Sequence, residues 1–216
     1  MNTDYAREQM VEQQVRAWEV FDTAILDVFR SVPRERFVPS AYELLAFADT
    51  EIPIGHGQSM LTPTIEGRLL QSLELRPTDR VLEVGTGTGF LTACLARLAA
   101  SVTSIDIVEE FVESARLRFE DAGTGNVELF VMDAMRELPD GGFDAIAVTG
   151  SIQPFDPRFV EALRPDGRLF VVVGDAPVME ARRIRRGPGE DWHTESLFET
   201  CLAPLVHGAA PPGFLF

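Results

Sequence analysis

The 216-residue sequence predicts an α/β fold, a doubly wound and mostly parallel sheet with an antiparallel C-terminal edge and a helical N-terminal segment. Three observations support this prediction. Short apolar runs alternate with amphipathic stretches over residues 80–174, which is the pattern of βαβ units covered on both faces. The segment before residue 55 shows helical spacing instead. Two strand-like stretches with no helix between them follow residue 178.

The sequence of the N-terminal part predicts four helices and a loop. Asp4 and Asp22 are candidate caps at helix starts, and Pro33 and Pro77 are expected to stop helices. A glycine-rich loop, GHGQSMLTP, shows neither helical nor strand periodicity. The helices are predicted over 4–19, from Asp22 to Pro33, over 41–47 and from Pro63 to Pro77.

The core follows from residue 64. We expect residues 1–63 to form the helical segment with its loop, and residues 64–216 to form the sheet core, integrated into one domain. The final two strands are expected to pair around the turn GPGED. Strands are predicted over 80–85, 101–107, 126–133, 143–150, 168–174, 179–186 and 193–205, with helices over 90–99, 109–123 and 157–167.

Composition limits the classes of partner. The formal net charge is −15 and lysine is absent, so binding to nucleic acid or an anionic membrane is disfavoured. The polar N-terminus lacks the apolar core of a signal peptide, and we therefore expect a soluble cytoplasmic protein. Cys94 and Cys201 are too few for a disulfide framework or a cysteine metal site, and both are expected to be buried.

A glycine loop, VLEVGTGTGF, follows the first predicted core strand. Glycines at this position let the chain turn sharply and let a ligand approach the main chain. The spacing is G-x-G-x-G, whereas the dinucleotide fingerprint is G-x-G-x-x-G. Glu83 precedes the loop, and its carboxylate suits a cationic ligand better than a pyrophosphate. S-adenosylmethionine, with its ammonium and sulfonium groups, fits this charge.

Two further acids stand at the ends of the next two predicted strands. Asp106 is placed to accept hydrogen bonds from both hydroxyls of a ribose, and Asp133 lies where an adenine is expected. Each acid alone is also typical of a solvated residue or a helix cap. Three acids in order around one glycine loop favour cofactor binding. The predicted cofactor site comprises Glu83, Gly85, Thr86, Gly87, Gly89, Asp106, Ile107, Asp133 and Ala134.

These motifs resemble the protein-L-isoaspartate O-methyltransferases, a branch of the class I S-adenosylmethionine-dependent methyltransferases. The resemblance runs nearly end to end and implies a Rossmann-like sheet. It also implies S-adenosylmethionine as cofactor, and methylation of the abnormal carboxylate that forms when Asn or Asp rearranges in a damaged protein or peptide. The matching stretches are Met10 to Gln14, Val32 to Pro39, Ile52 to Gln58, Glu83 to Gly89 and Ala203 to Val206.

The loop before Pro63 is the expected acceptor side, and it contains one departure from the family. The family's Thr-Ile-Ser-x-Pro is here Ser59-Met60-Leu61-Thr62-Pro63, so Leu61 stands where the family has its active-site serine. We take Ser59, Leu61 and Thr62 as the candidate catalytic positions. Either backbone amides and Ser59 position the acceptor, or the pocket is remodelled for another acceptor.

The chemistry explains why no nucleophile–base pair is visible. A carboxylate acceptor is ionised at neutral pH and needs orientation rather than a general base. Two alternatives stay open: a methyltransferase of the same fold with a small-molecule acceptor, and a protein that binds the cofactor without turnover. A cavity with polar walls favours an enzyme, whereas closure by Met60 and Leu61 favours the non-catalytic protein.

Three other features allow two interpretations each. His56 is either a surface residue or a substrate contact, and Trp18 is either a packing residue or a lid over the cofactor. The arginines from Arg182 to Arg186 form either the solvated face of an edge strand or a contact for a partner.

Overall fold

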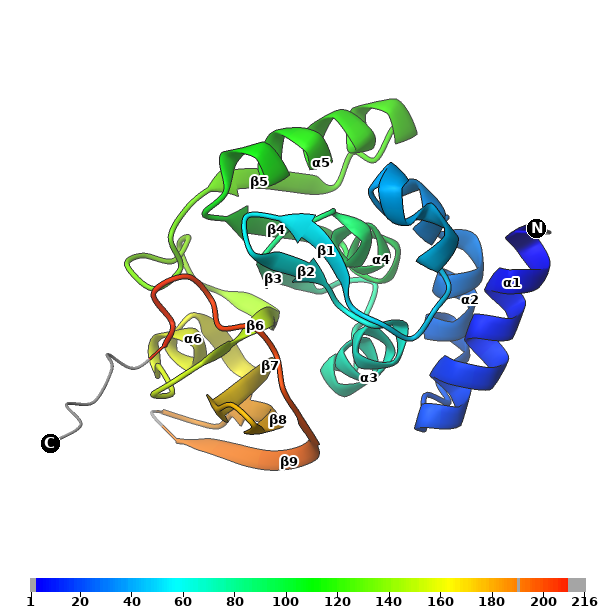
Figure 1. Cartoon of the computed structure of the whole chain (residues 1–216). Helices are drawn as coiled ribbons and strands as arrows, with labels where there is room; N and C mark the ends of the chain where they lie inside the picture. Colours follow the sequence, from blue (N-terminus) through cyan, green and yellow to red (C-terminus); the bar gives the residue numbers. More distant parts are fainter. Residues whose placement is uncertain (1–2, 190, 210–216) are drawn as a thin grey trace, which may run out of the picture.

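The computed structural model, which describes residues 3–189 and 191–209, has a seven-stranded sheet in the order β5-β4-β3-β6-β7-β8-β9. Strands β3 to β7 are parallel, and β8 and β9 continue the sheet in antiparallel pairing (Figure 1). The predicted sheet with its antiparallel edge is therefore confirmed. The strands are β3 (Arg80–Val84), β4 (Ser101–Asp106), β5 (Val127–Val131), β6 (Phe143–Ile152), β7 (Leu163–Asp175), β8 (Val178–Arg186) and β9 (Trp192–Thr200).

Helices cover both faces of the sheet and make up most of the N-terminal part (Figure 1). The first predicted helix is one continuous run, in which π-helical and 3-10 turns follow α1. Asp22 caps α2 as predicted, since its side chain accepts a hydrogen bond from the amide of Ala24. The helices are α1 (Thr3–Met10), η1 (Val11–Val15), η2 (Arg16–Trp18), α2 (Thr23–Ser31), η3 (Arg34–Arg36), η4 (Ser40–Leu45), α3 (Pro63–Leu73), α4 (Phe90–Leu98), α5 (Glu109–Ala122) and α6 (Arg158–Glu161).

The segment predicted as a loop forms a β-hairpin. Strand β1 (Ile52–Gly55) pairs with β2 (Gln58–Met60), and His56 and Gly57 between them have φ values of 52° and 71°. Two successive positive φ values are the geometry of a tight hairpin turn. The strands are too short to show an alternation in the sequence, which explains why the prediction was wrong.

The helix predicted over 157–167 is present only in its first part. Helix α6 ends at Glu161, and β7 begins at Leu163, which pairs with Phe143 of β6. Asp166, with φ of 64°, and Gly167 form a turn within the strand. A side chain at Gly167 would lie 2.8 Å from the carbonyl oxygen of Arg164, so this glycine permits a sharp bend rather than ending a helix.

Two buried clusters form the core, one on each face of the sheet. The larger cluster includes Phe29 of α2, Leu69 of α3 and Phe170 of β7, so the N-terminal helices pack into the same core as the sheet. Cys94 is buried as predicted, whereas Cys201 is exposed, which corrects the prediction for that residue. Within the described residues, no helix combines the length and the apolar character needed to cross a bilayer.

The arginines of β8 are occupied by partners within the chain. Arg183 pairs with Glu74 and Glu195, and Arg185 pairs with Glu74 at 2.9 Å. Arg186 donates to carbonyl oxygens at the end of α6. These contacts tie β8 to the end of α3. Because β8 lies between β7 and the edge strand β9, the prediction of an edge strand is corrected: the arginines stabilise the strand next to the edge. Trp18 packs edge-on against Phe198 of β9, which agrees with a packing residue.

Candidate functional site

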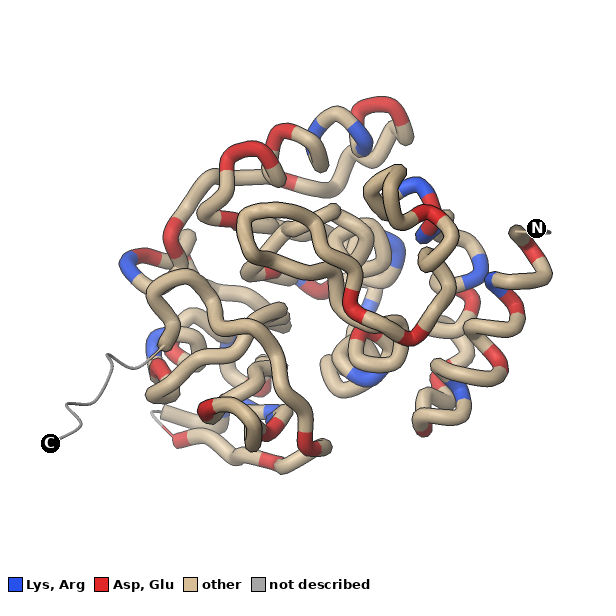
Figure 2. The backbone as a smooth tube through the Cα atoms, in the orientation of Figure 1, with Lys and Arg blue, Asp and Glu red and all other residues tan. Residues whose placement is uncertain are grey.

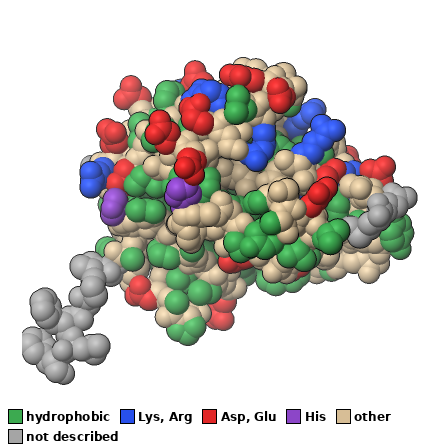
Figure 3. Space-filling view, turned by 45° about the horizontal axis from the view of Figure 1, so that its top comes forward, with side chains coloured by type: hydrophobic (Ala, Val, Ile, Leu, Met, Phe, Trp, Pro, Cys, Tyr) green, Lys and Arg blue, Asp and Glu red, His purple; other side chains and the backbone are tan. Residues whose placement is uncertain are grey.

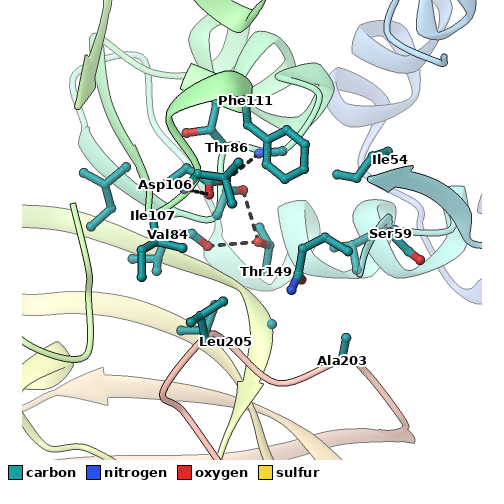
Figure 4. Close-up of a pocket in the computed structure, with 18 of the residues that line it drawn as sticks. Ile54, Ser59, Val84, Thr86, Asp106, Ile107, Phe111, Thr149, Ala203 and Leu205 are labelled. Atoms are coloured by element: carbon teal, nitrogen blue, oxygen red, sulfur yellow. Dashed lines mark hydrogen bonds between the residues drawn. The ribbon is translucent and has the colours of Figure 1, made fainter. Parts of the chain in front are cut away.

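A cavity opens at the carboxyl ends of the parallel strands. Most of its walls come from the hairpin β1–β2 with the residues after it, the loops after β3, β4 and β5, and the segment after β9, and β6 adds Thr149 and Gly150 (Figure 4). The loops after β3, β4 and β5 are those that the sequence predicted as a cofactor site. The described lining residues on the hairpin side are Glu51, Ile54, Gln58, Ser59, Met60, Leu61 and Glu66.

Thr149 of β6 supports the glycine loop after β3 by hydrogen bonds to its main chain. The Thr149 hydroxyl donates to the carbonyl oxygen of Val84 at 2.9 Å (Figure 4). Gly85 has φ of +97°, and a Cβ atom there would lie 2.1 Å from the Thr149 hydroxyl oxygen. This position therefore requires glycine for both conformation and space. Gly85, Thr86 and Gly87 line the cavity as predicted, whereas Gly89 packs under α5 residue Ala115 and caps α4.

Asp106 at the end of β4 faces the cavity. One carboxylate oxygen accepts from the amide of Gly87 and the other from the amide of Val108, both at 2.9 Å. Asp106 is 9% exposed, and burial raises the pKa of its carboxyl against the effect of these amides. Each oxygen keeps a lone pair for a hydroxyl group of a ligand. The neighbouring residue Ile107 also lines the cavity.

Glu83 lies beneath the glycine loop and outside the cavity lining, which corrects the prediction that its carboxylate faces the ligand. Ser104 donates to it at 2.6 Å, and Thr92 donates to the same oxygen. The Thr86 hydroxyl bonds to Ser104, so a chain of hydrogen bonds links the loop to Glu83. Glu83 is fully buried, and this burial raises the pKa of its carboxyl to about 8.

Asp133 after β5 also lines the cavity, together with Ala134. Its carboxylate already has partners: the amide of Met135 at 3.0 Å, His207 at 2.8 Å and Arg136 at 3.1 Å. His207 belongs to the segment after β9, which supplies Ala203 and Leu205 to the wall opposite the glycine loop (Figure 4). The sequence pointed to Ala203–Val206 only through the family resemblance, and it gave no signal for His207.

The three candidate catalytic positions separate in the structure. Ser59 on β2 and Leu61 line the cavity, and Leu61 is 9% exposed. Thr62 does not line it. Its hydroxyl caps α3 by accepting from the amide of Ile65 at 3.3 Å, and it bonds to Thr64 at 2.9 Å. The direct role predicted for Thr62 is therefore corrected, because capping uses its side chain.

An ion pair that no local sequence pattern indicates lies behind Leu61. Arg34 is fully buried and donates to the carbonyl oxygens of Leu61 at 2.7 Å and Ala46 at 3.0 Å. It also pairs with Glu66 on the first turns of α3, and its guanidinium lies over the ring of Phe90. Arg34 belongs to a stretch already matched to the family, but its partners are 12 to 32 residues away.

The hairpin is also tied to the other side of the cavity. His56 bonds to Glu110 at the start of α5 at 2.7 Å, and its ring lies edge-on to Phe111. Phe111 and Ile54 both line the cavity, and Figure 4 shows them next to each other in the upper part of the view. His56 thus acts as a structural contact between two walls. The hairpin strands themselves have no acidic residue or arginine (Figure 2).

The charge of the lining matches a cationic cofactor. Asp106 and Asp133 lie on the loops after β4 and β5, and no arginine or histidine is among the described lining residues. A pyrophosphate would meet these carboxylates without an arginine or histidine among the described lining residues to bind it, whereas a sulfonium and an ammonium are favoured by them. Glycine main chain, a carboxylate placed for a ribose and apolar walls together fit S-adenosylmethionine.

A family model and the curated relatives indicate the same family. The family model for protein-L-isoaspartate(D-aspartate) O-methyltransferase (PCMT) matches residues 5–210. A protein named protein-L-isoaspartate O-methyltransferase 2 from Pelobacter propionicus is 36% identical over 207 residues, which cover 95% of this chain and 92% of that protein. A protein-L-isoaspartate O-methyltransferase from Opitutus terrae is 40% identical over 201 residues, which cover 93% and 86%.

Solved structures agree in fold. A crystal structure from Plasmodium falciparum, assigned to the same family and determined in complex with S-adenosyl-L-homocysteine, superposes with a TM-score of 0.80. The alignment covers 95% of this chain and 99% of that chain at 19% identity. The similarity over nearly the whole of both chains includes the N-terminal helices as well as the sheet.

Proposed function

The chain belongs to the protein-L-isoaspartate(D-aspartate) O-methyltransferase family, and from this premise we propose that it methylates isoaspartyl carboxylates in damaged proteins or peptides. The observation that supports the proposal most is the cavity itself. One wall has the glycine loop and carboxylates suited to S-adenosylmethionine, and the facing wall has the polar groups of Gln58 and Ser59. These polar groups also favour an enzyme over a protein that binds the cofactor without turnover.

In this proposal, one group of residues binds the cofactor and another positions the acceptor. The main chain at Gly85 and Gly87 receives the methionine part of the cofactor, and Asp106 orients the ribose. Bound S-adenosylmethionine supplies a methyl group on a positively charged sulfur. The acceptor carboxylate is ionised near neutral pH, so no residue has to remove a proton from it. Ser59 and the hairpin main chain hold the acceptor oxygen in line with the methyl group.

Charge and free cysteines bear on the partners and the cell compartment of the protein. Acidic side chains spread across the upper part of the face shown in Figure 3, and the whole chain has a formal charge of −15. This charge opposes binding to nucleic acid and to anionic membranes. Cys94 and Cys201 are free thiols, which is typical of a reducing compartment. We therefore propose a cytoplasmic enzyme with protein or peptide substrates.

Methyl transfer to a matched pair of peptides tests this function. Two peptides of identical sequence, one with isoaspartate and one with aspartate, are incubated with labelled S-adenosylmethionine. We expect base-labile label on the isoaspartyl peptide alone, because a methyl ester hydrolyses in base. Binding of the cofactor with no transfer to the isoaspartyl peptide would contradict the proposal. Methylation of a small molecule, with neither peptide methylated, would show that the enzyme has a different class of acceptor.

A further inference from the structure

The wall around Leu61 has a polar group that the family resemblance does not assign. Leu61 has no hydroxyl to offer an acceptor, yet Glu66 lines the same cavity five residues further along the chain. Glu66 is 2% exposed and lies on the first turns of α3, which begins directly after the acceptor-side loop. Glu66 is therefore a fixed part of the acceptor wall.

Arg34 determines where this carboxyl lies. Its guanidinium pairs with one oxygen of Glu66 and donates to the carbonyl oxygen of Leu61. The same side chain therefore fixes the main chain at Leu61 and the head group of Glu66. Because Arg34 contacts Oε2 of Glu66, the other oxygen, Oε1, is the one available to carry a proton.

We propose that Glu66 contacts the acceptor carboxylate in place of the absent serine hydroxyl, and that Arg34 is the positioning residue that holds it there. This inference rests on the function proposed above. The carboxylic acid form of Glu66 donates a hydrogen bond from Oε1 to one oxygen of the acceptor. The other acceptor oxygen forms its bond to the methyl carbon as the bond from that carbon to sulfur breaks, and the proton stays on Glu66.

The surroundings of Glu66 favour the acid form. Burial raises the pKa of its carboxyl to about 7, although the charge of Arg34 and its hydrogen bond act in the opposite direction. Glu83 of β3 and the thiol of Cys94 on α4 also interact electrostatically with Glu66. An acceptor carboxylate beside Glu66 disfavours a second negative charge further, so substrate binding raises the protonated fraction.

The pH profile of methyl transfer is the first test. With the wild-type protein, kcat/KM for the isoaspartyl peptide should be roughly tenfold lower at pH 8 than at pH 6, because Glu66 loses its proton. Glu66→Gln keeps a donor in its amide but does not titrate. We expect this variant to remain active and to lose most of the decline. The matched control is Glu35→Gln, which breaks the 2.7 Å pair with Arg7 outside the cavity lining.

Rescue by a hydroxyl is the second test. Glu66→Leu removes the donor, and we expect a drop in kcat/KM of about ten- to a hundredfold with binding of S-adenosylhomocysteine little changed. Adding Leu61→Ser to this variant returns a hydroxyl to the same wall and should recover a large part of the activity. A role of Glu66 in folding alone would leave the double variant as inactive as Glu66→Leu.

Proton uptake separates this inference from the proposed function. Calorimetric titration of the isoaspartyl peptide into wild-type protein with bound S-adenosylhomocysteine, at pH 7 in two buffers of different ionisation enthalpy, should show a fractional proton taken up. Glu66→Gln should show none. Equal uptake by both proteins, or an unchanged pH profile in Glu66→Gln, would overturn the role of Glu66 and leave the function standing. Wild-type protein without peptide binding or transfer would overturn the function itself.

Discussion

The donor side and the acceptor side of the cavity are built in different ways. The glycine loop and Asp106 lie within 22 residues of one another and are held mainly by main-chain contacts and by Thr149. On the acceptor side, the buried guanidinium of Arg34 connects Ala46, Leu61 and Glu66. The donor side therefore depends on backbone geometry, whereas the acceptor side depends on one ion pair.

Removing Arg34 should have the largest effect. In Arg34→Met at pH 8, where Glu66 is ionised, this carboxylate loses its partner in a buried site, and we expect the free energy of unfolding to fall by about 3 to 5 kcal/mol. Urea denaturation measures this. Arg30→Met is the matched control, since Arg30 pairs with Glu8, Glu12 and Asp27 but is one-third exposed, with 34% of its side chain accessible. Equal losses in the two variants would contradict the special role of the buried pair.

Gly85→Ala tests the donor side. The added methyl group meets Thr149 and forces a residue with a side chain into a positive φ. Strain of about 1 to 3 kcal/mol should weaken binding of S-adenosylhomocysteine by roughly ten- to a hundredfold in calorimetric titration. Gly123→Ala also puts a side chain at a positive φ, +65°, but the added methyl group meets no atom within 4 Å, so it shows backbone strain without a clash. If both variants bind equally well, Thr149 does not shape the loop.

The free energy of unfolding should depend on pH through one buried carboxyl group on each side of the cavity, Glu83 on the donor side and Glu66 on the acceptor side. The pKa of Glu83 is raised to about 8 and that of Glu66 to about 7, from 4.5 for each. The folded state therefore holds protons that the unfolded state releases, and the free energy of unfolding should fall as pH rises from about 4.5 to 8. Urea denaturation at several pH values measures this slope.

Glu83→Gln isolates the donor-side part of that slope. The amide cannot ionise, so we expect a gain of at least about 1 kcal/mol relative to wild type above pH 8 and little difference at pH 5. Glu66→Gln should flatten the slope mainly below pH 7. A stability of Glu83→Gln that runs parallel to wild type across this range would show that Glu83 stays neutral or pairs with water.

The smallest effect is expected where the hairpin meets α5. His56 and Glu110 are 44% and 79% exposed at their side chains, and exposed pairs contribute little. His56→Ala should change KM for the isoaspartyl peptide by less than about threefold, with Glu110→Gln as its matched partner. A large loss in both would show that closing the hairpin over the cavity limits catalysis.

The same contrast explains what the sequence predicted. The parallel sheet, the antiparallel edge and the glycine loop follow from periodicity and spacing within short stretches. Asp106 was identified because a strand end is visible locally. Glu83 was assigned to the ligand because a sequence shows an acid beside a loop, but it does not show Ser104 and Thr92 beneath it.

On the acceptor side, contacts between distant residues decide the structure. The hairpin strands are too short for an alternation to be visible, and Thr62 has the same hydroxyl whether it caps a helix or faces a substrate. Arg34 and Glu66 each resemble ordinary surface residues until the fold brings them together 32 positions apart. His207 meets Asp133 across 74 positions, which no local pattern indicates.

The selectivity of methyl transfer tests the central claim most directly. The measurement is the ratio of kcat/KM for an isoaspartyl peptide to that for its aspartyl twin, taken at pH 6.5 with saturating S-adenosylmethionine. An acceptor wall shaped for isoaspartate predicts a ratio of at least about a hundredfold, because misplacing the acceptor oxygen by about 1 Å can cost that much. Comparable transfer to both peptides, or none to either despite cofactor binding, would contradict it.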